Sequence, residues 1–567
     1  MTVATAGARG AGVGVVVGAL LAGCLPAPEH HCQEAGECGA TAACVAGYCA
    51  FPVDTAVCSS GLQFGAGAGP RSGTCTEPPD LEIDAGVDSA IDAALPPPPF
   101  GLGLDGPATV APPIDRTLNT CAPVLPGPAG KVVRYDRARM SVATLPGVGD
   151  FVPGRLVLVW QTVTDASSVS PAVGAPGPFD LPGAGRYQLA RVAAVDTEAI
   201  TLVDDLGFAP TAGAQVCRVP ELTRLTVTSA VVDGVSQVGA LRPTPWNGAV
   251  GGLIALFASE GVTITGAGSS ISASGRGLRG GAGTSTMGTT AGCVGLTGPT
   301  GEGGGAHRGE GLFSTFYAPA AGARDAFGRG NATLGGGGGG CTNAGGGGGA
   351  GGGGAGGRGG SQAALAPTGN GLGGGPLALD LRRQLTLGGG GGGGEGNDNQ
   401  AGAGGVGGGA VAMWTARLTC TGTNGVRASG GAGNDSLAGG AIGDDGAGGG
   451  GGGGTIYVEA GAVDGCLFNA PGAEGGDTRH DPMSPQLTRG PGGGGGGGRV
   501  LVRAPTQTAV TYNLGGGAAG LVDRPSTNTG GASPGTAGVR CGDGLVGPGE
   551  TCDAGNLVPD DGCDNCL

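Results

Sequence analysis

Residues 448–476 read GGGGGGGTIYVEAGAVDGCLFNAPGAEGG, and this stretch carries the pattern that organises the second half of the chain. Seven glycines lead into an alternating apolar strand, a polar turn, a second short strand, and glycine again. Stretches that begin at Gly251, Gly409 and Gly498 follow the same plan, and the segment from Leu222 fits an earlier copy. The pattern therefore predicts a repeated β-unit.

The spacing of the repeat favours a β-solenoid. The strands that begin at Ala410, Thr455 and Arg499 lie 45 and 44 residues apart, whereas Leu253 lies 157 residues before Ala410 because a long glycine-rich insertion intervenes. Such short strands bury their apolar faces only against neighbouring copies. We therefore expect stacked coils.

The glycine runs at 335–340, 345–349, 388–394, 448–454 and 492–498 are similar in length, and three adjoin strands. Disorder is the ordinary reading of low-complexity glycine. Polyglycine also forms a threefold extended helix with a rise of ~3.1 Å per residue, and helices without side chains pack closely enough to hydrogen bond through their backbones. We favour an ordered, polyglycine II-like bundle. Collagen is excluded because no sustained Gly-X-Y register exists.

Composition limits both fold and partners. The 567 residues include 136 glycines, 4 % aromatic residues and a single lysine, Lys131, and the formal net charge is −15. An ordinary globular core cannot cover this length. Nucleic-acid binding is not expected, because the chain has no basic stripe.

The first 23 residues predict a removable signal peptide, with one positive charge at Arg9 and an apolar run too short to span a bilayer. The sequence Leu21-Ala22-Gly23-Cys24 resembles a bacterial lipobox. The resemblance implies a lipid on Cys24, cleavage before it, and a membrane as partner. Leu25 weakly favours the outer membrane. Ordinary signal cleavage, with Cys24 in a disulfide, is the alternative.

Sixteen cysteines remain once Cys24 is set aside, and they form even local groups. With four histidines in the chain, they are predicted to form disulfides in an oxidising compartment. The candidates are Cys32, Cys38, Cys44, Cys49, Cys58, Cys75, Cys121, Cys217, Cys293, Cys341, Cys420, Cys466, Cys541, Cys552, Cys563 and Cys566.

A mainly β chain is predicted, divided into segments of different composition. After the signal peptide we expect a cysteine-rich module (24–75), an acidic proline-rich linker (76–114), a small β-domain (115–222), the solenoid-like region (223–534) and a cysteine-rich repeat (535–567). Runs such as RLVLVWQTV from Arg155 indicate the strands of the β-domain, and Cys121 and Cys217 could clasp it.

Landmarks between Phe151 and Gly520, among them VPGRLVLVWQ, GRYQLARVAAV and ISASGRGLRGG, resemble a family of glycine-rich bacterial surface proteins. Some myxobacterial members are described as adventurous gliding motility proteins of the C type. The resemblance implies a cell-surface location more firmly than a mechanism.

The last segment, CGDGLVGPGETCDAGNLVPDDGCDNC from Cys541, resembles the myxobacterial cysteine-rich repeat. Its acidic residues would suit a structural calcium ion. A disulfide-held knob with a solvated acidic face is the alternative. The candidate ligands are Asp543, Glu550, Asp553 and Asp561.

Two short motifs match patterns of calcium-binding or catalytic sites. Residues 430–438 match one calcium β-roll nonapeptide with Asp435 as ligand, but a roll needs tandem copies. Residues 531–535 fit G-x-S-x-G around Ser533, but no histidine follows His480. His307 and His480 are expected at the surface.

We expect no enzyme and no cofactor beyond that calcium. A structural or adhesive role is favoured, with cell-surface polysaccharide or envelope proteins as the expected partners. The alternative is a polysaccharide-binding protein or a polysaccharide-degrading enzyme on a β-helix.

Overall fold

The computed structural model describes residues 43–45, 48–52 and 62–64, and then residues 100–541. Gaps in the longer range fall at 113–115, 146–148, 165–182, 233–234, 285–295, 297–304, 314–326, 332, 341–344, 362–368, 378, 397–399, 439–440, 443–444 and 481–487. The chain divides into two compact units, Met1–Leu95 and Pro96–Leu567. In the first unit, β1 (Ala43–Val45), β2 (Tyr48–Pro52) and β3 (Leu62–Phe64) form an antiparallel sheet. In its register Cys44 of β1 lies opposite Cys49 of β2.

The predicted small β-domain is an antiparallel barrel in the second unit. Its described strands run in the order β5 (Cys121–Pro123), β10 (Ala214–Val219), β7 (Leu156–Gln161), β8 (Tyr187–Val195), β9 (Ala199–Leu206), β6 (Gly130–Arg134). The two edges meet, because Val124 after β5 pairs with Tyr135 after β6. A 3-10 helix, η3 (Arg137–Arg139), follows β6.

Strand β7 is buried on both faces, as its continuous apolar run predicts. Val157 and Val159 pack inside the barrel. Leu158 and Trp160 point the other way, into a second core shared with the solenoid and the glycine-rich segments. One strand therefore joins the barrel to the rest of the unit.

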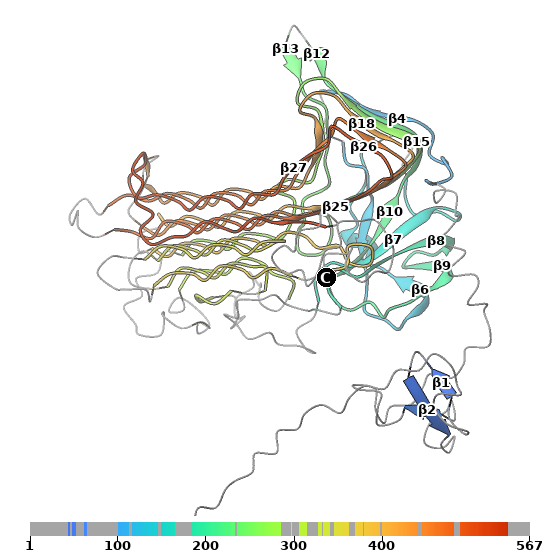
Figure 1. The fold of residues 1–567 in the computed structure, drawn as a ribbon, viewed down its shortest axis with the longest axis horizontal. Coiled ribbons are helices and arrows are strands. Elements are labelled where there is room, and N and C mark those ends of the chain that lie inside the picture. The colour runs from blue at the N-terminus through green and yellow to red at the C-terminus, as the bar shows by residue number, and fades with distance from the viewer. Residues whose placement is uncertain are drawn as a thin grey trace, which may run out of the picture. The chain divides into compact units, whose positions relative to one another are not determined.

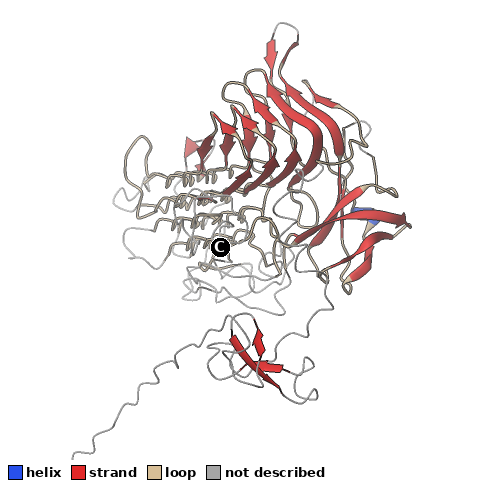
Figure 2. Ribbon diagram, turned by 45° about the vertical axis from the view of Figure 1, so that its right-hand side comes forward, coloured by secondary structure: helices blue, strands red, loops and turns tan. Residues whose placement is uncertain are grey.

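The repeated units form a parallel β-solenoid, so the expectation of stacked coils is confirmed (Figures 1 and 2). One row of strands consists of β15 (Leu253–Thr265), β17 (Ala410–Thr415), β22 (Thr455–Ala460), β25 (Arg499–Arg503) and β28 (Val539–Arg540). A second row continues the same sheet through β4 (Ala108–Val110), β11 (Glu221–Thr228), β15, β18 (Leu418–Cys420), β23 (Val463–Asp464) and β26 (Gln507–Thr508). The other sheet holds β14 (Ala240–Leu241), β16 (Ser270–Ser272), β19 (Gly425–Arg427), β24 (Leu467–Asn469) and β27 (Thr511–Asn513).

The strand starts predicted from the repeat spacing pair with one another in the solenoid. Leu253 pairs with Ala410, Ala410 with Thr455, and Thr455 with Arg499. Like residues therefore stack from coil to coil in the solenoid core, as in the column Ile254, Val411, Ile456, Val500. Apolar columns of this kind bury each coil against the next.

The sequence pattern predicts two strands per coil, and the structure adds a third. Each coil from β17 onward contains a third short strand between the other two, such as β18 between β17 and β19. In the first coil β15 covers both positions as one strand of 13 residues. The break at Ala416 and Arg417 reads as a turn in the sequence, although the chain continues in the same sheet.

The solenoid extends past the bounds predicted for it. Strand β4 lies within the range 76–114 and pairs with β11, while β28 lies within 535–567 and pairs with β25. Strand β11 begins inside the range 115–222. Two hairpins also project from the coils: β12 (Ala230–Val232) with β13 (Val235–Gln237), and β20 (Leu437–Ala438) with β21 (Ala441–Ile442).

The glycine-rich segments are ordered rods that lie side by side, as an extended bundle beside the sheets (Figures 1 and 2). Residues three apart bond to the same neighbour: Gly391 N and Gly394 N donate to Gly405 O and Gly402 O, each at 2.8 Å. This period of three is that of the polyglycine II helix. The rods comprise 277–284, 305–310, 335–340, 345–351, 354–360, 369–375, 388–394, 402–408, 428–434, 446–454, 470–476, 490–498, 514–520 and 530–538.

The rod at 388–394 lies at the centre of the bundle. Its N–H groups donate to the rods at 402–408, 345–351 and 305–310, and its carbonyls accept from those at 277–284, 446–454 and 335–340. All its backbone polar groups are thus paired without any strand. The long insertion between Leu253 and Ala410 supplies many of the rods that fill this bundle.

Glycine is required at the rod positions that face a neighbouring backbone, because the two backbones approach there too closely for a side chain. A Cβ on Gly390 would lie 1.8 Å from the carbonyl oxygen of Arg279, and one on Gly309 would lie 1.7 Å from that of Gly390. Only the rods made of pure glycine runs can be identified from the sequence pattern. Rods such as 428–434 and 470–476 also carry alanine, serine or proline, and low-complexity criteria miss them.

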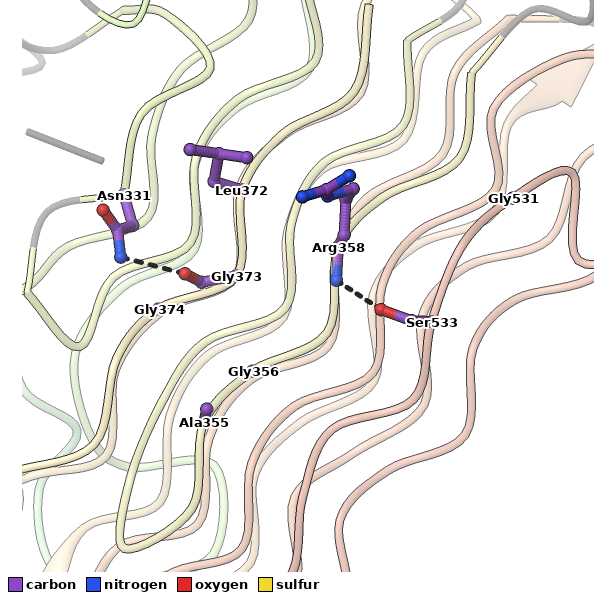
Figure 3. Close-up of a pocket in the computed structure, with 9 residues that line it drawn as sticks. All are labelled: Asn331, Ala355, Gly356, Arg358, Leu372, Gly373, Gly374, Gly531 and Ser533. Carbon is purple, nitrogen blue, oxygen red and sulfur yellow. Dashed lines mark hydrogen bonds between the residues drawn. The ribbon is translucent and has the colours of Figure 1, made fainter. Parts of the chain in front are cut away.

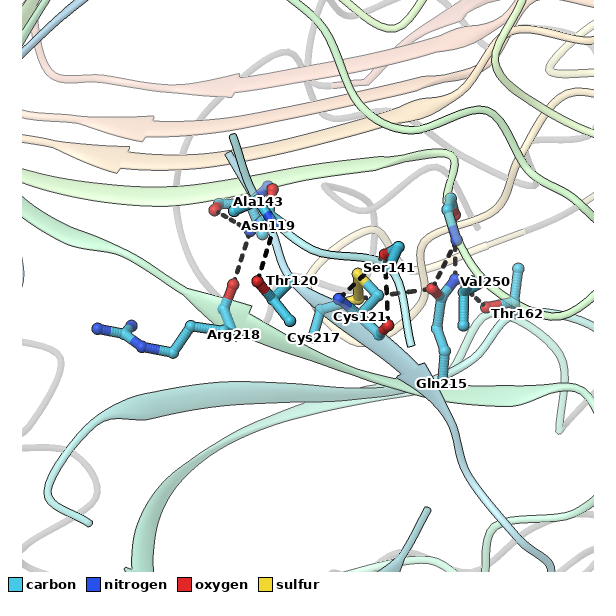
Figure 4. Close-up of a disulfide and its surroundings, with 12 residues drawn as sticks. Asn119, Thr120, Cys121, Ser141, Ala143, Thr162, Gln215, Cys217, Arg218 and Val250 are labelled. Carbon is cyan, nitrogen blue, oxygen red and sulfur yellow. Dashed lines mark hydrogen bonds between the residues drawn. A yellow bond between two sulfur atoms is a disulfide. The ribbon is translucent and has the colours of Figure 1, made fainter. Parts of the chain in front are cut away.

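Polar side chains fasten the barrel to the solenoid beside the Cys121–Cys217 disulfide (Figure 4). The Asn119 amide donates to Arg218 O at 2.9 Å and Ala255 O at 2.8 Å, and its oxygen accepts from Ala255 N at 3.1 Å. The Gln215 side chain pairs in the same way with both backbone groups of Gly251. These amides take the place of a neighbouring strand at the start of β15.

A second disulfide, Cys420–Cys466, joins two successive coils across 46 residues of sequence. Replacing both cysteines by alanine is expected to lower the free energy of unfolding by about 2–4 kcal/mol, because the open loop regains entropy in the unfolded chain. Chemical denaturation of the variant and the parent chain measures this. An unchanged denaturation midpoint would show that stacking alone holds the two coils.

Candidate binding groove

Three of the hollows on the surface of the described residues differ in the charge they present. The first runs between glycine rods and is bordered by Arg358, Leu372 and Ser533. The second lies on the outer face of the solenoid beside Arg224 and Arg417. The third lies at rod ends, where Asp435, Glu474, Asp477 and Arg524 meet.

The first hollow, here called the rod groove, has a volume of about 480 Å³ (Figure 3). Its walls are the rods that contain Gly356, Gly373 and Gly531, so much of its lining is bare backbone. Asn331 is buried in the wall, and its side-chain amide donates to Gly373 O at 2.9 Å. The volume lies in the range of small-molecule sites.

Arg358 is held in the rod groove through its backbone. Arg358 N donates to Ser533 Oγ at 2.8 Å, and Ser533 N donates to Arg358 O at 2.9 Å. The side chain is exposed, and Figure 3 shows its guanidinium projecting from the rod beside the groove. Among the described residues, no carboxylate forms an ion pair with this guanidinium. Ser533, the centre of the G-x-S-x-G match, therefore joins two rods by hydrogen bonds in this structure.

A second arginine, Arg329, lies near enough to Arg358 to feel its charge. Burial lowers the pKa of the Arg329 guanidinium from its ordinary value, and the positive charge of Arg358 lowers it further. Arg329 Nη1 also donates to Asn370 O at 3.2 Å. Arg358 therefore places a positive charge at the groove, on a chain of net charge −15.

The solenoid hollow, about 340 Å³, lies over Gly261 between Arg224 and Arg417. Thr226, Thr263 and Thr419 lie in register across three strands beside it. Adjacent strands are ~4.8 Å apart, so these hydroxyls form a regular column. Here the charge of Arg224 is compensated, because its Nη2 donates to Glu260 Oε2 at 2.8 Å.

In the third hollow, about 640 Å³ in volume, the charged side chains are paired with one another. Arg524 pairs with Asp477 and, at 3.2 Å, with Glu474, while the Asp435 carboxylate accepts from Asp477 N at 2.7 Å. Asp435 thus fastens a rod end. Its nonapeptide lies in the rod at 428–434, outside any β-roll, and within the described residues no cluster of three or more His, Cys, Asp or Glu is placed to hold a metal.

The structure places only part of the predicted site residues. Cys121 bonds to Cys217 and Cys420 to Cys466, and Cys49 and Cys541 are disulfide-bonded as well. Cys44 lies in β1. The lipid-attachment residue Cys24 and the calcium candidates Asp543, Glu550, Asp553 and Asp561 lie outside the described residues. So do Cys32, Cys38, Cys58, Cys75, Cys293, Cys341, Cys552, Cys563 and Cys566.

The two histidines considered in the sequence are less exposed than expected. His307 is partly buried against the ring of Phe327, 4.1 Å away between centroids, and burial lowers the pKa of its imidazole. His480 Nδ1 contacts Asp523, and that hydrogen bond holds the pKa of Asp523 below its ordinary value despite some burial. Arg358 was missed in the sequence because nothing in its glycine-rich context distinguishes it.

These features define a β-solenoid protein whose coils are joined to a bundle of polyglycine II-like rods. Residues 539–567 match a family described as a domain of unknown function (DUF4215). No curated protein and no solved structure matches the chain. Among the described residues there is no helix with the length and apolar character to cross a bilayer.

Proposed function

We propose that this protein is a lipid-anchored structural or adhesive element of the bacterial cell surface. The observation that carries the proposal is the continuity of sheet and bundle. The rod at 446–454 leads without interruption into β22, and the rod at 470–476 follows β24 directly. Solenoid and bundle therefore move as one body, which suits a spacer or a contact surface that must transmit load.

The backbone hydrogen bonds of the rods support the same proposal. Rods without side chains are held to several neighbours at once, so a single broken contact leaves most of the bonds of a rod in place. The disulfides add resistance in an oxidising exterior. The lipobox at Cys24 supplies the attachment, and a multiply acylated cysteine gives a firm anchor.

The proposal predicts where the protein is found. An antibody to residues 542–567 is expected to label intact cells, and Cys24→Ser is expected to move nearly all of the protein from the membrane fraction to the soluble fraction, because the lipid is lost. Cys75→Ser, which removes a neighbouring cysteine outside the lipobox, is the matched control and is expected to stay with the membrane. Labelling that requires permeabilised cells would contradict a surface role.

Adhesion is tested separately on a strain that lacks the protein. Loss of attachment to a solid surface, restored by the parent gene and not by the Cys24→Ser gene, is the expected result. The family resemblance adds a motility-associated form of the proposal. Unchanged gliding of single cells in the same strain would remove that form and leave adhesion untouched.

A polysaccharide-binding role is the second candidate, and the exposed Arg358 beside the rod groove favours it. A glycan array together with a cleavage assay separates binding from degradation. Retention without shortening of the polymer is the outcome expected for a binding protein.

A further inference from the structure

We propose that the rod groove binds the carboxylated sugar units of an acidic polysaccharide, with the Arg358 guanidinium as the group that recognises the carboxylate. The inference deepens the proposed adhesive function and rests on it for its setting at the cell surface. Its chemistry rests on the groove alone. Of the hollows described above, the rod groove is the one whose lining holds an arginine and no acidic residue, and Arg358 forms no ion pair among the described residues.

The position of Arg358 is fixed independently of its side chain. Both of its hydrogen bonds to Ser533 use other groups, the backbone N–H and the backbone carbonyl. The guanidinium is therefore carried by a rigid rod and is not needed to hold that rod. A planar guanidinium offers paired N–H donors that match a carboxylate, and such charge-assisted pairs are stronger than neutral hydrogen bonds.

The neighbourhood of Arg358 favours an anion. Arg329 carries a like charge close by, and the two cations repel each other. An anion beside Arg358 compensates the charge of its guanidinium, whereas a cation or a neutral ligand does not. In the solenoid hollow Glu260 already fills this role for Arg224. The rod groove offers no such carboxylate among its described lining residues.

The remaining lining suits a sugar ring. Leu372 provides an apolar contact, and the Ser533 hydroxyl, whose oxygen accepts from Arg358 N, keeps its own proton for donation. The glycine backbones at Gly356 and Gly374 leave the floor free of side chains, so a broad ligand can approach peptide groups. A carboxylated sugar presents an anion, hydroxyls and an apolar face together.

The test measures binding of the full-length mature chain to sodium alginate, with dextran as the neutral polymer and sodium acetate as the free anion. Alginate is expected to bind, with an affinity that falls as salt is added, and dextran is not. Arg358→Gln is expected to weaken alginate binding by about tenfold or more, because the charge-assisted pair is lost. Arg383→Gln removes the same charge from a side chain that is 84 % exposed and is expected to change nothing.

The outcomes are separable. Unchanged thermal unfolding of Arg358→Gln shows that the variant folds, since the hydrogen bonds of Arg358 to Ser533 are made by its backbone. Equal alginate binding by the parent and Arg358→Gln chains overturns the groove, as does equal binding of dextran and alginate. Acetate that binds as well as alginate, unit for unit, reduces the site to a free-anion site and also overturns the proposal. Surface labelling and adhesion can survive any of these results, so the failure of the groove is distinct from the failure of the surface role.

Discussion

Gly390→Ala is expected to destabilise the bundle by about 3 kcal/mol or more, a large effect for the addition of one methyl group. The added Cβ would lie 1.8 Å from Arg279 O and 2.4 Å from Arg279 C. Both atoms belong to a neighbouring backbone, so no side chain can rotate away. Relief requires the central rod to separate from the rod at 277–284, which breaks backbone hydrogen bonds that the low-dielectric interior makes costly to leave unpaired.

The measurement is chemical denaturation combined with hydrogen exchange of the amides at 388–394. Exchange in the variant should rise in this rod and in the rods that bond to it. Gly149→Ala is the matched control, because a Cβ at Gly149 meets nothing within 4 Å, and its stability is expected to stay within ~0.5 kcal/mol of the parent. If Gly390→Ala had the same free energy of unfolding as the parent, the two rods could not lie as close together as described.

The second large effect is expected at a buried charge network between the barrel and the solenoid. Arg218 Nη2 donates to both oxygens of Asp105 at 2.9 Å, and each side chain is 1 % exposed. Asp105 also accepts from Glu221 N at 2.7 Å, and Glu221 in turn pairs with Arg191. Burial lowers the pKa of the Arg218 guanidinium, and the neighbouring Asp105 carboxylate opposes this shift.

Arg218→Met is expected to cost about 3–5 kcal/mol of unfolding free energy, because Asp105 is left buried with its main partner removed. The double variant Asp105→Asn with Arg218→Met should recover part of this loss, since the buried carboxylate is removed and the charge left without its partner, Arg155 at 3.2 Å from Asp105, is 29 % exposed. Arg383→Met, at a side chain 84 % exposed, should cost less than about 1 kcal/mol. A double variant as unstable as the sum of both single changes would show that the pair contributes through packing alone.

Much of the architecture follows from local sequence pattern. Alternating apolar residues between glycines predict the strands, and the intervals of 45 and 44 residues predict which ones stack, because a solenoid requires each coil to bury its neighbour. The pairing of Ala410 with Thr455 and Arg499 bears this out. The even cysteine groups likewise predict disulfides: Cys121 and Cys217 are expected as a pair, whereas the group of four that contains Cys420 and Cys466 leaves the partners open, and the structure pairs these two.

The rod groove could not be predicted in this way. It forms where rods containing Asn331, Arg358 and Ser533 lie together, and glycine-rich sequence carries no side-chain code for which rod lies beside which. Arg358 and Ser533 are 175 residues apart, and apart from the Ser533 hydroxyl their contact is made by backbone groups that every sequence possesses. An isolated arginine in low-complexity sequence gives no signal of a site.

The sequence by itself determined the mainly β class, the coil repeat and the need for glycine, since apolar periodicity and the absence of side chains are local properties. The tertiary structure alone decided the order of the rods, the third strand of each coil and the continuation of the solenoid into β4 and β28. Those features depend on backbone hydrogen bonds between segments far apart in the chain. Such bonds form wherever packing brings two backbones together, whatever residues the segments carry.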